Sequence, residues 1–367
     1  LANCTGNVLV ADAIDPAQTS SDFPQKLFNP VLYTGSGGTQ TITGVGFQPD
    51  FTWIKNRGAS ADHVLMDSTR GAYGTNDYYY LRSNTTAAQD HTTDFHNFAS
   101  DGFIVSGTGS YFNASGNTFV GWNWRANGGT TASNSNGDLT STVQVDPSGG
   151  FSIVTYTGTL SGAGTETVGH GLSVAPNFII TKVTGQVGNW WVWSDEFTSW
   201  NYGMNLNTTS ALFDKSGNGS MSAPTSTVFD TNWTDGMNDE QGNIAYCFAN
   251  IEGYTRSGSY VGNGDDDGTF VYTGFRPAFI IIKEKIIDSW LMYDDKRFGI
   301  NTSASGGNST LYPDDAASEG VGGGGRAIDI LSNGFKLRTS NATGNANGGN
   351  YLYFAMAENP FKYSTAR

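Results

Sequence analysis

The chain has 367 residues, more than the roughly 100–200 residues of a typical single domain, so we expect more than one hydrophobic core. It contains 49 glycines, 26 aspartates and only seven glutamates, and this bias toward turn and strand-end residues over helix formers predicts many strands and turns. The formal net charge of −14, with no run of Lys or Arg, argues against binding to nucleic acid or anionic membrane surfaces.

Composition also bears on folding, membrane insertion and cysteine chemistry. Aromatic residues make up 13% of the chain and charged residues only 14%, which separates it from disordered sequences. No apolar stretch approaches the roughly 18 residues that would span a bilayer, so we expect no membrane insertion. Neither Cys4 nor Cys247 belongs to a zinc-binding cluster, and the apolar segment 244–249 predicts a buried free thiol at Cys247.

Recurring motifs divide the chain into three diverged repeats. Residues 1–27 match no part of a repeat and are expected to form a lead-in segment. Residues 28–126 form the first repeat and residues 127–150 a polar linker followed by a strand at about 139–145. Residues 151–253 and 254–367 form the second and third repeats.

Two of the motifs are strands in every repeat. An apolar strand that ends in Tyr-Thr-Gly occurs at residues 31–35, 153–158 and 270–274. The motif Pro-x-Phe-x-x-x-Lys occurs at residues 49–55, 176–182 and 277–283. Proline is tolerated at the start of a strand, and the β-branched run that follows predicts a strand buried on both faces.

Two further motifs complete the repeat. An Asp-Gly or Asn-Gly turn precedes a strand at residues 100–105 and 332–337, and the middle repeat keeps only a remnant at 226–229. An alternating aromatic strand closes each repeat, at residues 119–124, 243–248 and 351–356. Its large side chains fall two residues apart, which places them on one face of a sheet.

Short strands at this spacing predict an all-β fold in which each repeat is a β-sandwich or jelly-roll-like module with many loops. Helix should be scarce. Residues 91–100 are the best candidate for a short helical turn.

Several unusual motifs, in order along the chain, carry a resemblance to a known family. They are residues 46–57, 119–125, 151–158, 168–172 and 357–363. Over about Phe28 to Lys362, the chain resembles a repeat family of virion structural and tail-fibre proteins from tailed phages of marine bacteria and cyanobacteria. The resemblance implies an extracellular, host-facing location on the virion, with other phage tail or virion proteins as partners. It supplies no catalytic or sugar-binding residues.

Tryptophans in the second repeat form the first candidate binding surface. Trp190, Trp191 and Trp193 precede Asp195, and Trp191 and Trp193 share one face of a strand because they alternate with Val192. Aromatic faces stack on sugar rings while nearby carboxylates accept hydroxyl hydrogens. Core packing is the alternative for these tryptophans.

Exposed aromatic residues are expected at two further places. The run Tyr78, Tyr79 and Tyr80 and the loop residues Trp200 and Tyr202 could present large contact areas at low entropic cost. We therefore include them among the candidate ligand-binding residues.

A candidate cation site lies in the third repeat. Asn263, Asp265 and Asp267 place oxygen ligands at alternate positions, as in a calcium loop, but Gly274 occupies the position where such a loop carries a bidentate glutamate. A Ca²⁺ site and a solvated hairpin turn both remain open. No other cofactor is expected.

The motifs of common enzymes are missing. The sequence has no G-x-S-x-G, no H-E-x-x-H and no Walker pattern, and its four histidines, His63, His91, His96 and His170, are expected in structural or surface positions. We therefore expect a non-enzymatic virion protein, a tail-fibre segment that binds a host cell-surface glycan or receptor. Capsid-surface decoration and a glycan-depolymerising tailspike are the alternatives. A homotrimer is expected because neighbouring copies would cover apolar strips on the modules.

Overall fold

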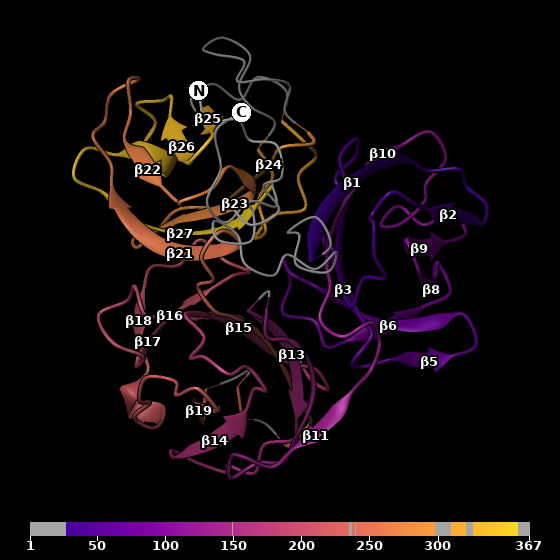
Figure 1. The fold of residues 1–367 in the computed structure, drawn as a ribbon, viewed down its shortest axis with the longest axis horizontal. Helices are drawn as coiled ribbons and strands as arrows, with labels where there is room; N and C mark the ends of the chain where they lie inside the picture. The colour runs from indigo at the N-terminus through magenta and orange to yellow at the C-terminus, as the bar shows by residue number, and fades with distance from the viewer. Residues whose placement is uncertain are drawn as a thin grey trace, which may run out of the picture.

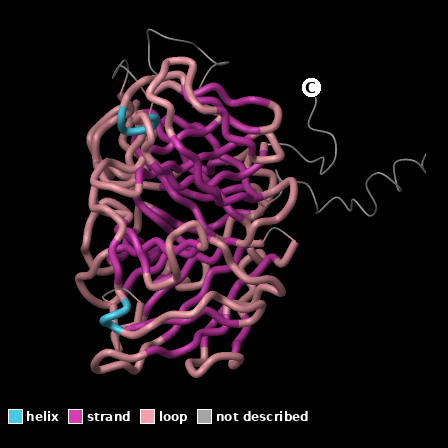
Figure 2. Tube along the Cα trace, turned by 90° about the vertical axis from the view of Figure 1, so that its left-hand side faces the viewer, coloured by secondary structure: helices cyan, strands magenta, loops and turns pink. Residues whose placement is uncertain are grey.

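The computed structural model describes residues 27–148, 150–234, 237–238, 240–297, 310–320 and 326–358. In these ranges the chain is all-β, as predicted, and its helices are the 3-10 turn η2 (Ser216–Asn218) and the single turn α2 (Ala342–Asn345). Figure 2 shows strands filling the middle of the molecule and loops surrounding them. The predicted lead-in segment, except Leu27, lies outside the described residues, as does Cys4.

Residues 27–126, here called unit 1, form two antiparallel sheets. The large sheet has the order β1-β10-β3-β4-β6-β5, and β7 also pairs with β6. Its strands are β1 (Phe28–Thr34), β3 (Phe51–Asn56), β4 (Val64–Asp67), β5 (Ala72–Gly74), β6 (Asp77–Arg82), β7 (Asp90–Thr92) and β10 (Thr118–Trp124). The small sheet has the order β2-β9-β8, with β2 (Gln40–Ile42), β8 (Phe95–Ala99) and β9 (Gly102–Val105).

Residues 127–253, unit 2, have the large sheet β11-β12-β13-β20-β15-β16-β17-β18 and the small sheet β14-β19. The strands are β11 (Ala132–Asn134), β12 (Ser141–Asp146), β13 (Phe151–Tyr156), β14 (Thr165–Gly169), β15 (Phe178–Val183), β16 (Trp190–Ser194), β17 (Tyr202–Asn205), β18 (Phe213–Asp214), β19 (Val228–Asn232) and β20 (Asn243–Phe248). The strand predicted at 139–145 is thus β12, and the polar stretch before it, predicted as a linker, contributes the short strand β11 to this sheet.

Residues 254–358, unit 3, have the large sheet β21-β27-β23-β24 and the small sheet β22-β26-β25. The strands are β21 (Thr255–Val261), β22 (Phe270–Tyr272), β23 (Pro277–Glu284), β24 (Leu291–Asp294), β25 (Ile328–Leu331), β26 (Gly334–Leu337) and β27 (Asn350–Ala357).

The three large sheets share one arrangement. In each, the strand that closes the unit (β10, β20 or β27) lies between the Pro-x-Phe strand (β3, β15 or β23) and one earlier strand (β1, β13 or β21). The register is also shared, because the residue paired with the motif phenylalanine is Trp124 for Phe51, Phe248 for Phe178 and Met356 for Phe279. These equivalences support the interpretation of three repeats.

One motif was assigned to the wrong strand of unit 3. Residues 270–274 lie in the small sheet as part of β22, whereas the strand that occupies the place of β1 and β13 is β21. By register, Tyr260 therefore corresponds to Tyr33 and Tyr156. The hydroxyl group donates a hydrogen bond to a backbone carbonyl outside the strands in all three units: Tyr33 to Phe112, Tyr156 to Met237 and Tyr260 to Gly344 of α2.

The three large sheets face a common centre, where a single core joins the units (Figure 1). Trp122 and Trp124 of unit 1, Phe248 of unit 2, and Phe279 and Phe354 of unit 3 all lie in this core. The ring centroids of Phe248 and Phe354 are 4.7 Å apart and those of Trp124 and Phe279 are 5.6 Å apart. The opposite face of each large sheet packs on a separate core within its own unit.

Polar contacts across the central core connect the units. Trp122 Nε1 of unit 1 donates to Asp294 Oδ2 of unit 3 at 3.0 Å, and the Tyr246 hydroxyl of unit 2 donates to Asp67 Oδ2 of unit 1 at 3.0 Å. Each acceptor aspartate is also paired with a nearby arginine, Arg297 or Arg70. Because all these groups are buried, the contacts are specific to one orientation of the units.

The motif lysines are buried and bind backbone carbonyls. Lys55 Nζ donates to Ala316 O of unit 3 at 3.1 Å, and Lys182 Nζ donates to Thr86 O of unit 1 at 3.2 Å. Burial lowers the pKa of Lys55 to about 8. The lysine that ends the Pro-x-Phe strand thus connects neighbouring units in two of three cases.

The helical turn predicted at 91–100 is wrong. This segment forms the end of β7 and all of β8, and a register shift between Phe95 and Asn97 interrupts the pairing of β8 with β9. Phe95 and Phe98 both enter the core of unit 1. The three-residue spacing that resembles a helix is therefore produced by an irregularity in a strand.

Cys247 is a buried free thiol, as predicted.

Loss of a central side chain should destabilise all units together. We expect Trp124→Ala to lower the free energy of unfolding by about 3–5 kcal/mol, because it leaves a cavity between three sheets. Differential scanning calorimetry should show one unfolding transition at a lower temperature. Separate transitions for the three units would contradict a shared core.

Asp314 should make stability depend on pH. Burial raises the pKa of its carboxyl group to about 7, so the folded chain retains a proton that the unfolded chain releases near pH 4. The native state loses this advantage as the pH rises through 7. We expect Asp314→Asn to raise the melting temperature more at pH 8 than at pH 5. The exposed neighbour variant Asp315→Asn is the control, and an equal effect of Asp314→Asn at both pH values would contradict the prediction.

Candidate functional site

The tryptophans predicted to bind a ligand are core residues. Trp191 and Trp193 lie in the core of unit 2 and Trp190 in the central core, each at most 2% exposed. Trp190 Nε1 donates to Arg82 O of unit 1 at 2.7 Å. Both faces of β16 are covered, so these rings are not available to stack on a sugar. Core packing, the alternative considered from the sequence, is therefore the correct interpretation.

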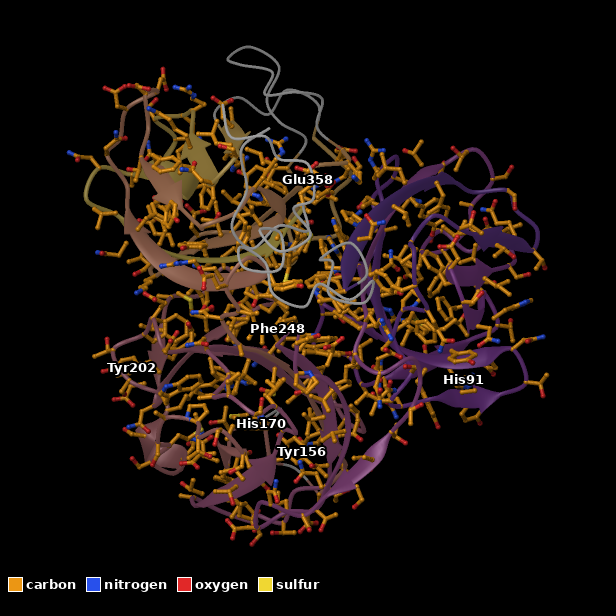
Figure 3. The ribbon with its side chains drawn as sticks, viewed as in Figure 1. His91, Tyr156, His170, Tyr202, Phe248 and Glu358 are labelled. Carbon is orange, nitrogen blue, oxygen red and sulfur yellow. The ribbon has the colours of Figure 1, made fainter. Side chains whose placement is uncertain are left out.

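Three further candidates are dispersed over unit 2. Trp200 is buried in the core of unit 2, and Tyr202 is half-buried against the edge of the central core (Figure 3). Asp195 is exposed, and Asn177 Nδ2 donates to it at 2.6 Å. The structure does not bring these side chains together with the strand tryptophans as one binding surface.

The tyrosine run on β6 divides between two faces of the sheet. Tyr78 and Tyr80 pack on the core of unit 1, and the Tyr78 hydroxyl donates to Asn97 Oδ1 at 2.9 Å. Tyr79 lies on the opposite face and remains half-exposed. The alternation of a strand therefore leaves one of the three predicted tyrosines available to a ligand.

Tyr79 belongs to an aromatic cluster on the hairpin of β5, β6 and β7. The rings of Tyr73 and Tyr79 are in edge contact at 5.5 Å, and the ring of Tyr73 stacks on His91 at 3.8 Å. Asp77 fixes the imidazole through a contact of 2.9 Å with Nδ1. Tyr73 is 57% exposed, and Figure 3 shows His91 on the outer side of unit 1. The hairpin thus presents an aromatic surface next to unit 2.

A polar groove with a volume of about 410 Å³ adjoins this hairpin. Residues of units 1 and 2 both line it: Thr69, Arg70, Tyr79, Gln89, Thr140, Ser141, Thr142, Thr155, Tyr156, Thr157, Thr184, Gly242 and Asn243. The volume lies within the usual range of small-molecule sites. Hydroxyl and amide groups dominate the lining, so the groove offers hydrogen bonds to a polar ligand.

The position of the groove depends on contacts between the units. Gln89 N donates to Thr184 O at 2.8 Å, which joins the loop after β6 to the end of β15. Arg70 is held by Asp67 through Nε at 2.5 Å and by Leu65 O through Nη2 at 3.1 Å. The Gln89 contact joins the two units, and the Arg70 contacts hold its side chain against its own unit in the groove wall.

The threonines of the groove were not predicted. Thr142 of β12 pairs in register with Thr155 of β13, so two short Thr-x-Thr segments, 140–142 and 155–157, meet on neighbouring strands. That repeated pattern is the signal in the sequence that could have marked the site. Their approach to Tyr79 is a property of the tertiary structure.

The candidate calcium loop uses its oxygens internally. The side chain of Asn263 accepts from Asp265 N at 3.0 Å, and Asp265 accepts from Asp267 N at 2.8 Å. The Asp267 carboxylate contacts Lys336 at 2.7 Å and Arg338 at 2.9 Å. In the described ranges, no group of three or more His, Cys, Asp or Glu side chains is arranged to hold a metal ion.

Two of the histidines have structural positions. His63 Nδ1 accepts from Trp53 Nε1 at 2.9 Å, and burial lowers its pKa well below the usual value. His170 Nδ1 accepts from Leu172 N at 3.1 Å, and burial lowers its pKa to about 4. Both imidazoles are therefore neutral at physiological pH.

The fold and groove define the chain as an all-β protein of three packed units with a polar site at a junction between two of them. It belongs to the family described as a domain of unknown function, DUF7483, whose model matches residues 23–360. No curated protein and no solved structure matches the chain. In the part of the chain that the structure describes, no helix is long and apolar enough to cross a membrane.

Calcium should have no effect on stability. Because Asp267 is already paired with two cationic side chains, binding of Ca²⁺ would have to displace them. We expect the melting temperature to be the same with 5 mM CaCl₂ and with a chelator, to within about 1 °C. An increase of the melting temperature in the presence of calcium that is absent in the variant Asp265→Asn would instead assign a cation site to this loop.

Proposed function

We propose that the chain is a non-enzymatic virion protein, a host-facing tail-fibre segment whose groove between units 1 and 2 binds a cell-surface glycan. The observation that carries the proposal is the combination of this polar groove with the aromatic hairpin beside it. The resemblance to phage tail-fibre proteins is the reason for placing the glycan on a host cell.

The chemistry of the groove suits a saccharide. Sugars present hydroxyl groups on their edges and weakly apolar C–H groups on their faces. Thr142, Thr155 and Gln89 can exchange hydrogen bonds with the hydroxyls, while the ring of Tyr79 can lie against a sugar face. A site of this kind gains affinity from being rigid before the ligand arrives.

The packing of the units supports a rigid platform. The groove is built from strands of two large sheets that share the central core, so its walls are fixed relative to each other. A fibre segment must hold its binding site in position while it is attached to a large particle. The shared core meets that mechanical requirement.

The homotrimer remains a prediction, and the structure weakens one of the reasons given for it. We expected neighbouring copies to cover apolar strips on the modules. In the structure, the aromatic faces of the three closing strands cover one another within one chain. Sedimentation of the purified chain at micromolar concentration would determine whether further copies associate.

Removal of Tyr79, the half-exposed tyrosine of the groove, should weaken glycan binding. We expect Tyr79→Ala to reduce the affinity for the bound oligosaccharide by about tenfold, because stacking area is lost. The measurement is binding of the purified chain to immobilised oligosaccharides and to host cells with and without their surface glycans. Tyr272→Ala, which removes a tyrosine that is 56% exposed in unit 3, is the matched control.

The possible results separate the parts of the proposal. Equal binding by the two variants would exclude the groove as the site. Failure of the folded wild-type chain to bind any oligosaccharide or any host cell would contradict glycan binding altogether.

A further inference from the structure

We infer that the groove selects a saccharide with an anionic group, a carboxylate or a sulfate. The inference rests on the proposed glycan binding and adds the chemical class of the ligand. It follows from the charges on the groove wall and from the hydrogen-bonding state of the side chains there.

The groove is locally different from the rest of the molecule. The chain as a whole has a net charge of −14, but the lining of the groove contains no aspartate or glutamate. Arg70 is the one lining residue that carries a formal charge at neutral pH. A wall with one guanidinium group and no carboxylate of its own lacks the repulsion that an anionic ligand group would meet elsewhere on this acidic chain.

The guanidinium group of Arg70 is held in place but is not fully satisfied. Its side chain is only 5% exposed, Nε and Nη2 are used by Asp67 and Leu65, and the Tyr246 hydroxyl of unit 2 also interacts with the guanidinium group. Nη1 has no hydrogen-bond partner among the described residues. An unpaired donor on a buried cation is costly, and an anionic acceptor is the partner that relieves this cost most effectively.

Two neighbouring side chains extend the pattern. Thr69 Oγ1 and Gln89 Oε1 are also buried without a partner among the described residues, and both residues line the groove. The threonine hydroxyl can donate to the same anion as Arg70. The Gln89 carbonyl oxygen can only accept, so it requires a donor such as a sugar hydroxyl. An acidic sugar supplies a charged acceptor together with hydroxyl donors. The hydroxyl groups of a neutral sugar also donate and accept, but their hydrogen bonds to a guanidinium group are weaker than those of an anion, and an inorganic anion lacks the hydroxyl donors of a sugar.

Asp67 neutralises the formal charge of Arg70 but does not use all of its hydrogen-bond donors. Its carboxylate is fully buried and receives the Tyr246 hydroxyl in addition to Arg70. It is not among the residues that line the groove. Of this ion pair, only Arg70 therefore belongs to the groove wall.

The test uses a pair of substitutions at Gln89. Gln89→Glu adds a carboxylate to the groove wall at almost unchanged size, and Gln89→Met removes the amide without adding charge. Backbone pairing of residue 89 with Thr184 is unaffected by either change. Arg70 is left intact, because its removal would leave the buried Asp67 unpaired and could prevent folding.

The full chain and both variants would be applied to an array that carries neutral, carboxylated and sulfated oligosaccharides of matched backbones. We expect the oligosaccharides that bind to be acidic. Comparison of the carboxylated with the sulfated members then shows which of the two anions the groove prefers. Gln89→Glu should weaken this binding by about tenfold more than Gln89→Met does, and added salt should reduce the difference.

Each other result contradicts some part of the inference. Equal binding of neutral and acidic members would overturn the anionic preference while leaving glycan binding in place. Equal effects of the two Gln89 variants on acidic members would show that charge in the groove does not determine selection. No binding to any member by the folded wild-type chain would remove the proposed function and this inference with it.

Discussion

The structure depends on one constraint: each large sheet is apolar on both faces, so each must be covered twice. One face packs on the small sheet of its own unit, and the other has no partner within that unit. The three remaining faces meet in one central core, where Phe28, Trp124, Phe248 and Phe354 interdigitate. Burial of this much aromatic surface contributes a large part of the driving force for folding, and it makes the units interdependent.

Aromatic packing alone would allow the units to rotate against one another, and the buried polar contacts restrict that freedom. The pair Asp67 and Arg70 of unit 1 receives Tyr246 of unit 2, and Asp294 with Arg297 of unit 3 receives Trp122 of unit 1. By register, Phe354 takes the corresponding place at the third junction, where it has no polar group to donate. The first of these junctions also positions Arg70 in the wall of the groove, so assembly of the units and formation of the site are one event.

The sequence predicted structure best where the residues of a single strand were sufficient. The Pro-x-Phe strands and the closing strands could be found because they are apolar along their whole length or alternate in size. Features that depend on packing against another part of the chain were harder to predict. The alternation of Trp191 and Trp193 fitted a ligand surface as well as core packing, because nothing in the local sequence reveals that the core of unit 2 covers this face. The irregularity in β8 that brings both Phe95 and Phe98 to the core is not visible in the sequence, and the helical turn predicted there was wrong. The groove joins Arg70 to threonines about seventy residues later, and only the central core brings them together.

The same constraint limits where a ligand can bind. Sheets that are covered on both faces leave hairpins, strand edges and junctions as the available surface. Strand β6 lies near the edge of the unit 1 sheet and uses its alternation for both purposes, since Tyr78 and Tyr80 stabilise the core while Tyr79 faces the groove. A binding residue on a strand whose other side is buried has little freedom to move, and that is the condition under which a few hydrogen bonds and one aromatic ring can discriminate between similar saccharides.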